Sequence, residues 1–141
     1  MAEPWVGRPL TRREDLRFVT GHATYVGDLP AEGALHLGFV RSPSAHARLG
    51  AIDAGAAMAL DGVAAVVTAA DLEGRWDPYG IAAAEGSQVA TVPLPLLGSG
   101  TVRFVGEPVA AVLAETPALV EDALELVLVD YDDLPPVADV E

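Results

Sequence analysis

The sequence predicts an α/β (α+β) domain: a mixed sheet with two strand–helix–strand units, preceded by an extended N-terminal arm. Residues 63–68 and 108–115 are short apolar runs of the kind that form buried strands. Residues 117–128 place apolar side chains at the spacing of one helix face. Residues 1–34 are rich in Arg, Pro and Gly and are assigned to the arm, so residues 35–141 form the folded body of a single domain.

The body is expected to begin with a strand over residues 35–42 (LHLGFVRS). Since side chains alternate along a strand, Leu35, Leu37 and Phe39 share one face. The other face is filled by His36, Gly38 and Val40. Within the arm, only the short stretch ATYV at 23–26 carries a strand signal.

The first strand–helix–strand unit is predicted over residues 48–74. RLGAID and VAAVVT are its strands, and AGAAMAL between them is a short helix. Asp53 is the expected N-cap of that helix, because its carboxylate can accept a backbone N–H that lacks a helical partner. AADLEG, which follows the second strand, predicts one helical turn.

The second unit is predicted over residues 108–131. PVAAVLAE is a buried strand, Thr116-Pro117 starts a helix with proline at its first position, and LVLVDY is the closing strand. A helical crossover of this length can join parallel strands, and such connections are right-handed. We therefore expect the two strands of this unit to run parallel.

Residues 74–100 separate the two units and show little periodicity. A loop of this length inside a compact domain is unusual, so we expect it to be functional or to pack against a partner. Its apolar stretch VPLPLL, which contains Leu94 and Leu96, is unfavourable in water and is a candidate contact surface.

Composition excludes several classes of protein. Of 141 residues, 51% are apolar and 21% charged, as in globular domains, and no apolar run is long enough for a membrane span. The N-terminus has no apolar stretch of the length found in signal peptides, so a cytoplasmic location is expected. The lack of cysteine rules out disulfides, thiolate metal sites and iron–sulfur ligation within the chain. The net charge of −13 repels phosphate backbones and argues against nucleic-acid binding.

The sequence contains no self-contained catalytic or cofactor-binding pattern. The three histidines fall in different predicted elements, the chain has no lysine for a phosphate-binding loop, and Gly98-Ser99-Gly100 lacks the spacing of a serine nucleophile. We therefore assign no catalytic, cofactor-binding or metal-binding residue.

Glu107 needs separate consideration, because it stands with Pro108 at the head of an apolar run. A general acid or base needs a proton-transfer partner and a cleft that tunes its pKa, and the neighbouring Arg103 and Pro108 identify neither. A polar stop before a buried strand is the favoured interpretation. The alternatives are contact with a neighbouring domain and a place at the edge of a site built mainly by other residues. The candidate interface residues are Arg41, Leu94, Leu96, Phe104, Gly106 and Glu107.

Four stretches in order resemble one known module: TGHATYVGDLP (20–30), LHLGFVRSPSAHARL (35–49), PLLGSGTVRFVGEPVAAVLAET (95–116) and VDYDDLPPV (129–137). They look like the α/β hammerhead domain of the large subunit of the xanthine dehydrogenase, aldehyde oxidase and carbon monoxide dehydrogenase family. The resemblance implies an oxidoreductase complex with a molybdenum pterin cofactor and with iron–sulfur and flavin subunits as partners. It implies no cofactor and no catalytic residue in this chain, since the family's pterin-binding segments and catalytic glutamate belong to later domains.

The leading hypothesis is a non-catalytic hammerhead domain or split-off subunit of a molybdenum hydroxylase, which packs against the molybdopterin-binding domains and is inactive alone. One alternative is a standalone ligand- or protein-binding module that reuses the fold, with a homo-oligomeric interface over VPLPLL. Another is an independent small enzyme that uses Glu107 or Asp28, for which the sequence offers no partner to tune the carboxylate.

Overall fold

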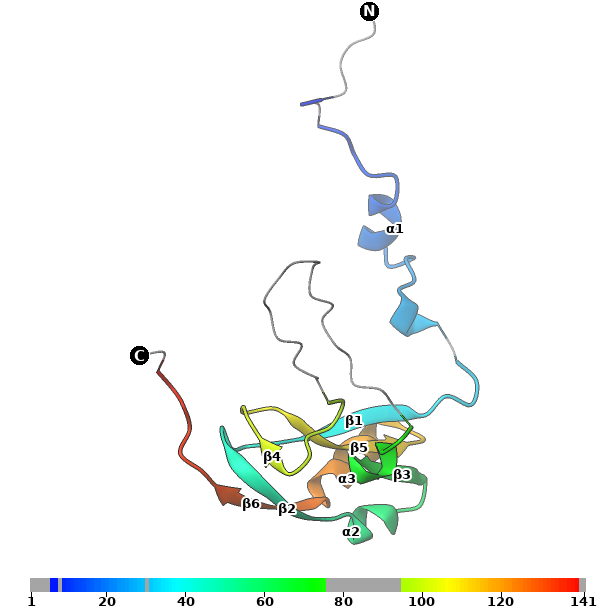
Figure 1. Cartoon of the computed structure of the whole chain (residues 1–141). Helices are drawn as coiled ribbons and strands as arrows, with labels where there is room; N and C mark the ends of the chain where they lie inside the picture. The colour runs from blue at the N-terminus through cyan, green and yellow to red at the C-terminus, as the bar shows by residue number, and fades with distance from the viewer. Residues whose placement is uncertain (1–5, 8, 30, 76–94, 140–141) are drawn as a thin grey trace, which may run out of the picture. The chain divides into compact units, whose positions relative to one another are not determined.

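The computed structural model of the chain describes residues 6–7, 9–29, 31–75 and 95–139. Two compact units are present, Met1–Gly33 and Ala34–Glu141. Figure 1 labels the α-helices and the strands along the chain.

The first unit holds two short helices, α1 (Asp15–Val19) and the 3-10 helix η1 (Val26–Asp28). The strand predicted at 23–26 is not formed. Its backbone turns instead, because the Tyr25 N–H donates to the Asp28 carboxylate at 2.8 Å and the two residues form a capping box at the start of η1. A local side-chain acceptor has therefore outcompeted strand pairing in this segment.

Three antiparallel strands of the second unit form sheet A, in the order β1-β5-β3. Their bounds are β1 His36–Arg41, β3 Val63–Thr68 and β5 Pro108–Ala114. In β5, which lies in the centre, five of the six residues Val109–Ala114 are buried. The apolar runs of β3 and β5 thus became strands, as predicted.

Sheet B is also antiparallel and has the order β4-β2-β6. Its strands are β2 Ala47–Asp53, β4 Thr101–Val102 and β6 Leu128–Asp133. Along β6, Val129 and Tyr131 pack toward a core cluster, while Asp130 and Asp132 alternate with them. Sheet B therefore shows the alternation expected of a sheet with one wet side.

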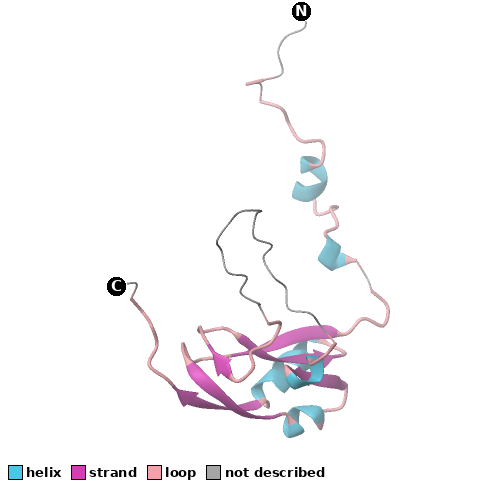
Figure 2. Ribbon diagram, in the orientation of Figure 1, coloured by secondary structure: helices cyan, strands magenta, loops and turns pink. Residues whose placement is uncertain are grey.

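Two helices of the second unit pack on sheet A, α2 (Gly55–Met58) and α3 (Pro117–Glu125). The helices touch each other, α3 lies against β1 and β5, and α2 lies against β3 (Figure 2). Thr116 caps α3 by accepting the Leu119 N–H at 3.2 Å, with Pro117 at the first position as predicted. The N-cap position of α2 is Ala54 rather than the predicted Asp53, although the Asp53 carboxylate accepts the Gly55 N–H at 2.9 Å.

The close approach of α3 to β1 depends on Gly38. A Cβ atom at this position would clash with Val120 of α3 and lie 2.9 Å from Cδ1 of Leu124. Glycine is required here because no side chain fits between strand and helix. This clash also shows that position 38 and its cross-strand partner Val112 lie on the side of sheet A that faces the helices. The side chains of Leu37 and Phe39 therefore lie on the opposite side.

The α/β hammerhead class is confirmed, but the expected parallel pairing in one mixed sheet is wrong. All described strand pairs are antiparallel, because the two strands that flank each helix belong to different sheets. The chain passes from β2 through α2 into β3, and from β5 through α3 into β6, so each helix connects the two sheets. Crossover length permits a parallel pair but does not require one.

A β-bulge in β5 joins the two sheets into one packed body. Val40 pairs with Ala110 and the next residue, Arg41, pairs with Pro108, which leaves Val109 as the extra residue. Val109 packs with Ala47 and Val102 of sheet B. Val112 of the same strand packs under the helices, so β5 contributes to both core clusters.

None of the helices in the described ranges is long and apolar enough to cross a membrane.

Candidate functional site

Four of the predicted interface residues, Arg41, Phe104, Gly106 and Glu107, meet at the turn that leads into β5. The turn covers residues 103–107 and lies beside the end of β1. Leu96 lies in the segment just before β4, and Leu94 falls outside the described residues. The structure thus brings most of the predicted set together around one turn.

Gly106 gives the turn its shape. The N–H of Glu107 donates to the carbonyl of Phe104 at 3.2 Å, which closes a four-residue turn, and Gly106 occupies its third position with φ +91°. A positive φ at this position is the mark of a type II turn and favours glycine over residues that carry a Cβ atom.

Glu107 is buried, with 5% of its surface exposed, and both of its carboxylate oxygens contact Arg103. Oε2 accepts the backbone N–H of Arg103 at 2.6 Å, and Oε1 lies 3.6 Å from Nη1 of its guanidinium. The Glu107 carboxylate therefore links the last residue of the turn to its first, by a charge-assisted hydrogen bond to the backbone. It matches the polar stop favoured by the sequence and shows no proton-transfer partner among the described residues.

Ser42 extends the pairing of β1 with the turn. Its N–H donates to the Glu107 carbonyl at 2.9 Å, and its carbonyl accepts the Gly106 N–H at 2.8 Å. Nη1 of Arg41 donates to the Gly106 carbonyl at 2.9 Å. These three bonds fix the turn to the end of β1, so Arg41 acts on the turn through a backbone carbonyl rather than a carboxylate.

Two apolar side chains at the tip of the turn point into solvent. Phe104 and Val105 are 56% and 65% exposed, and together with residues 136–138 they line an open hollow of about 510 Å³. Leu96 is half exposed, whereas its neighbour Leu97 is buried. The surface around the turn is therefore rigid in its backbone and apolar at its tip, which suits contact with another protein surface.

Beneath this region, Tyr131 carries a buried hydroxyl that has no hydrogen-bond partner among the described residues. Burial raises the pKa of Tyr131 above its ordinary value, and the nearby Ser42 hydroxyl opposes this shift only in part. The ring of Tyr131 packs against the core cluster of Ala47, Val102 and Val109.

The histidines and the acidic side chains of the described residues were candidates for a metal site. The described residues contain no group of three or more His, Cys, Asp or Glu side chains placed to hold a metal ion. His46 bonds the Pro135 carbonyl at 2.9 Å and His22 bonds the Thr20 hydroxyl at 3.1 Å, so both rings have local structural partners.

One feature was missed in the sequence, namely the exposure of the strand face that carries Leu35, Leu37 and Phe39. These side chains are 44%, 56% and 39% exposed, although they form the more apolar face of β1. The neighbouring strands carried a signal for this second apolar face. Continuous apolar runs such as β3 and β5 are typical of strands with apolar residues on both faces, so sheet A could have been expected to be apolar on both sides.

Comparison with known proteins gives a consistent family match. Residues 20–135 match the family model described as "Aldehyde oxidase and xanthine dehydrogenase, a/b hammerhead domain". The chain is 44% identical over 137 residues to the nicotine 6-hydroxylase large subunit of Paenarthrobacter nicotinovorans, covering 95% of this chain and 16% of that protein.

Solved structures agree with the match. Quinoline 2-oxidoreductase from Pseudomonas putida 86 superposes with a TM-score of 0.83 at 42% identity, over 95% of this chain and 17% of that one. A Cu,Mo carbon monoxide dehydrogenase superposes with a TM-score of 0.79 at 40% identity, over 94% of this chain and 16% of that one. The chain thus spans about a sixth of the length of these relatives.

Proposed function

The chain belongs to the a/b hammerhead domain family of aldehyde oxidase and xanthine dehydrogenase, and on this premise we propose that it is a non-catalytic packing domain of a molybdenum hydroxylase. Its homologues are molybdenum hydroxylases, and it matches a fragment of their large subunits. The observation that carries the proposal is this match, which covers residues 20–135 of the chain but about a sixth of each relative.

The described residues do not fit a molybdenum pterin. Glu107, the buried acid of the candidate site, has both oxygens against Arg103, and no three potential metal ligands gather elsewhere in the described ranges. The hollow beside residues 103–105 is lined mainly by apolar residues, and its two polar side chains, Arg103 and His46, already bond the backbone carbonyls of Thr101 and Pro135. In the proposed complex, the cofactor is held by other domains, and this chain contributes packing surface.

The turn at 103–107 is the proposed point of contact with the molybdopterin-binding domains. Its backbone is fixed by Ser42 and Arg41, so its exposed apolar tip can be buried at little cost in conformational entropy. Iron–sulfur and flavin subunits would complete the same complex without touching a reacting group of this chain.

Affinity purification from the native cells tests this function. The full chain carries a tag, and the eluate is analysed for polypeptides, for molybdenum and for pterin. We expect a molybdenum-containing polypeptide to copurify in a fixed molar ratio with the tagged chain. A tagged chain that elutes alone, as a monomer without molybdenum, would contradict the proposed function, and a homo-oligomer would favour the reuse of the fold as a binding module.

A further inference from the structure

The outer face of sheet A is apolar from edge to edge. Its cross-strand rows are Leu37–Leu113–Ala65 and Phe39–Ala111–Val67. Directly paired residues point to the same side of a sheet, so these rows lie opposite the side on which α2 and α3 pack. Leu35, just before β1, has the same parity and extends the surface. These seven residues are called the outer apolar face.

The strand pattern indicates that this face is meant to be covered. In a sheet with one wet side, polar residues alternate with apolar ones, as they do in β6. β3 (VAAVVT) and β5 (PVAAVLA) have no such alternation and are apolar on both sides. Yet on β1 the side chain of Leu37 is 56% exposed. Among the described residues of the second unit, the helices cover one side of sheet A, and no layer covers the other side at this edge.

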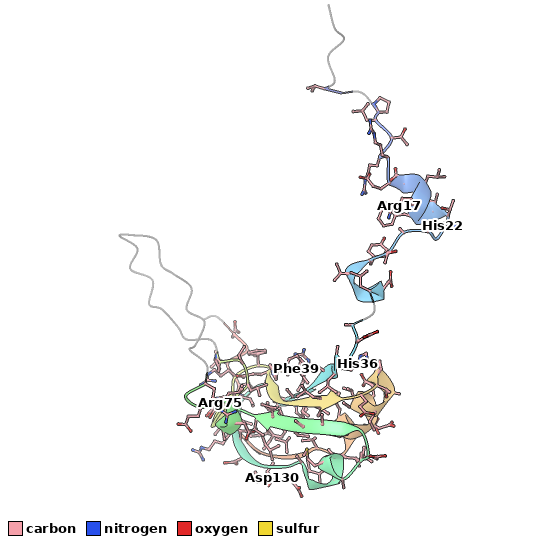
Figure 3. The ribbon with its side chains drawn as sticks, turned by 90° about the vertical axis from the view of Figure 1, so that its right-hand side faces the viewer. Arg17, His22, His36, Phe39, Arg75 and Asp130 are labelled. Carbon is pink, nitrogen blue, oxygen red and sulfur yellow. The ribbon has the colours of Figure 1, made fainter. Side chains whose placement is uncertain are left out.

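Charge is distributed unevenly around this face. The three strands of sheet A contain no Asp or Glu, although the chain has a net charge of −13. The guanidinium of Arg41 lies 5.6 Å from the ring centre of Phe39, so a cation borders the apolar surface. Figure 3 shows Phe39 and Asp130 on opposite sides of the second unit. A partner with carboxylates beside an apolar segment would find no acid on these strands to repel it.

We propose that the outer apolar face docks an apolar segment of the molybdopterin-binding polypeptide, and that a carboxylate at the margin of this segment pairs with Arg41. The proposal rests on the proposed function and adds a second contact surface to the turn at 103–107. The relatives are about six times as long as this chain, so a family partner has ample sequence to supply the segment. A second copy of this chain is a poorer occupant, because it would bring together two chains of charge −13 and place like cations at the contact.

The test compares two matched substitutions in the full tagged chain, purified from the native cells. Leu37→Asp places a carboxylate in the outer apolar face, and Leu128→Asp does the same on β6 of sheet B. Both positions lie on edge strands and are more than half exposed, at 56% and 66%. We expect Leu37→Asp to lower the copurified molybdenum per chain at least about tenfold, because truncating or charging a central interface residue commonly costs this much. Leu128→Asp should retain it.

Arg41→Glu is the second variant. It replaces Leu37→Asp in the comparison if Leu37→Asp lowers the melting temperature of the isolated chain, since loss of copurification could then come from unfolding. Arg41→Glu is expected to reduce copurification severalfold by repelling the partner's carboxylate, and Arg41→Met, which also loses the bond to the Gly106 carbonyl but adds no negative charge, should reduce it less. Equal copurification by the wild type and every variant would overturn the docking face and leave the proposed function standing. If the wild type itself brings down no molybdenum polypeptide, the proposed function fails, and the docking proposal fails with it. A wild-type dimer that Leu37→Asp dissociates in light scattering would assign the face to a second copy instead.

Discussion

Sheet A and sheet B each contain three antiparallel strands, but they differ in the side chains that they turn away from the core. The strands of sheet B carry four aspartates and one arginine, whereas those of sheet A carry one arginine and no acid. On the outer side of sheet B, Arg48 and Asp132 form an exposed ion pair at 3.3 Å. At the corresponding positions of sheet A stand leucine, phenylalanine, valine and alanine.

The difference lies in the alternation of polar and apolar residues along the strands. A polar residue at every second position indicates that one side of a strand is solvated, and a continuous apolar run indicates that both sides are covered by protein. Sheet B is complete in the described structure, while sheet A has one side covered by helices and the other side partly exposed. Sheet B therefore has a polar outer side that suits water, whereas sheet A has an apolar outer side that, in our proposal, a partner covers.

The largest expected effect is on the covered side of sheet A. Gly38→Val would force a branched side chain between β1 and the residues Val120 and Leu124 of α3. We expect the free energy of unfolding to fall by about 3 kcal/mol, the upper range for overpacking a core. Urea unfolding followed by circular dichroism measures this change.

The matched control in sheet B is Gly50→Val. A Cβ atom there would lie 2.9 Å from Cβ of Asp130, but the position is exposed and next to an irregularity in the β2–β6 register. The strand can therefore yield, and we expect a loss of about 1 kcal/mol. Equal losses at Gly38 and Gly50 would contradict the contrast between a covered and an exposed side.

A second, smaller effect is expected at the turn that leads into the central strand of sheet A. Glu107→Ala would remove the acceptor of the Arg103 N–H and leave a gap beside the turn. We expect a loss of about 2 kcal/mol in the free energy of unfolding, because the part-buried Arg103 N–H loses its charged acceptor. The control Arg103→Ala removes a guanidinium that is 61% exposed, and should cost about 0.5 kcal/mol or less.

The ion pair on sheet B should contribute little. Arg48 and Asp132 are 69% and 72% exposed in their side chains, so water and salt screen their attraction. We expect Arg48→Ala to change the free energy of unfolding by about 0.5 kcal/mol or less, and the difference to vanish in 1 M salt, where the screening length is about 3 Å. A larger loss that salt does not reduce would show that the outer side of sheet B is not simply solvated.

The smallest effect concerns Asp71, next to the end of β3. Its carboxylate accepts the backbone N–H and the hydroxyl of Thr68, both at 2.8 Å, and these bonds hold the pKa of Asp71 below its ordinary value of 3.8. Because the folded pKa is depressed, the stabilisation is present above pH 3.8 and is lost as the pH falls through the lower folded value. A carbon-detected NMR titration should place the Asp71 midpoint below 3.8, and Thr68→Val should move it back toward that value.

Much of the fold was predictable from residues that act locally. The Thr116-Pro117 start of α3 and the β-branched run of β3 specify their elements through short-range chemistry, and both formed where expected. The pairing of strands was not predictable, because it depends on which sheet each strand joins after a helix. That choice follows from contacts such as Gly38 against α3, which lie about 80 residues apart in the sequence.

The candidate site divides in the same way. Gly106 and Glu107 were recognised because a glycine and a proline flank a carboxylate, and the structure brings them together with Arg41 and Phe104. The direct partner of Glu107, the Arg103 backbone N–H, could not be read from the pattern, since any backbone amide could have served. The outer apolar face was missed because apolar residues are assigned to the core by default, and only the position of the helices shows which side they leave open.

Because of the bulge at Val109, the number of residues in β5 cannot change without disturbing the core. Val112 reaches one core cluster and Val109 the other only because one residue is inserted between the two registers. A deletion or duplication of a single codon in this strand would turn one of these valines out of its core, since a slip of one residue inverts every side chain beyond it. Substitutions can therefore accumulate along β5 during evolution, while single-codon insertions and deletions within it should be purged by selection.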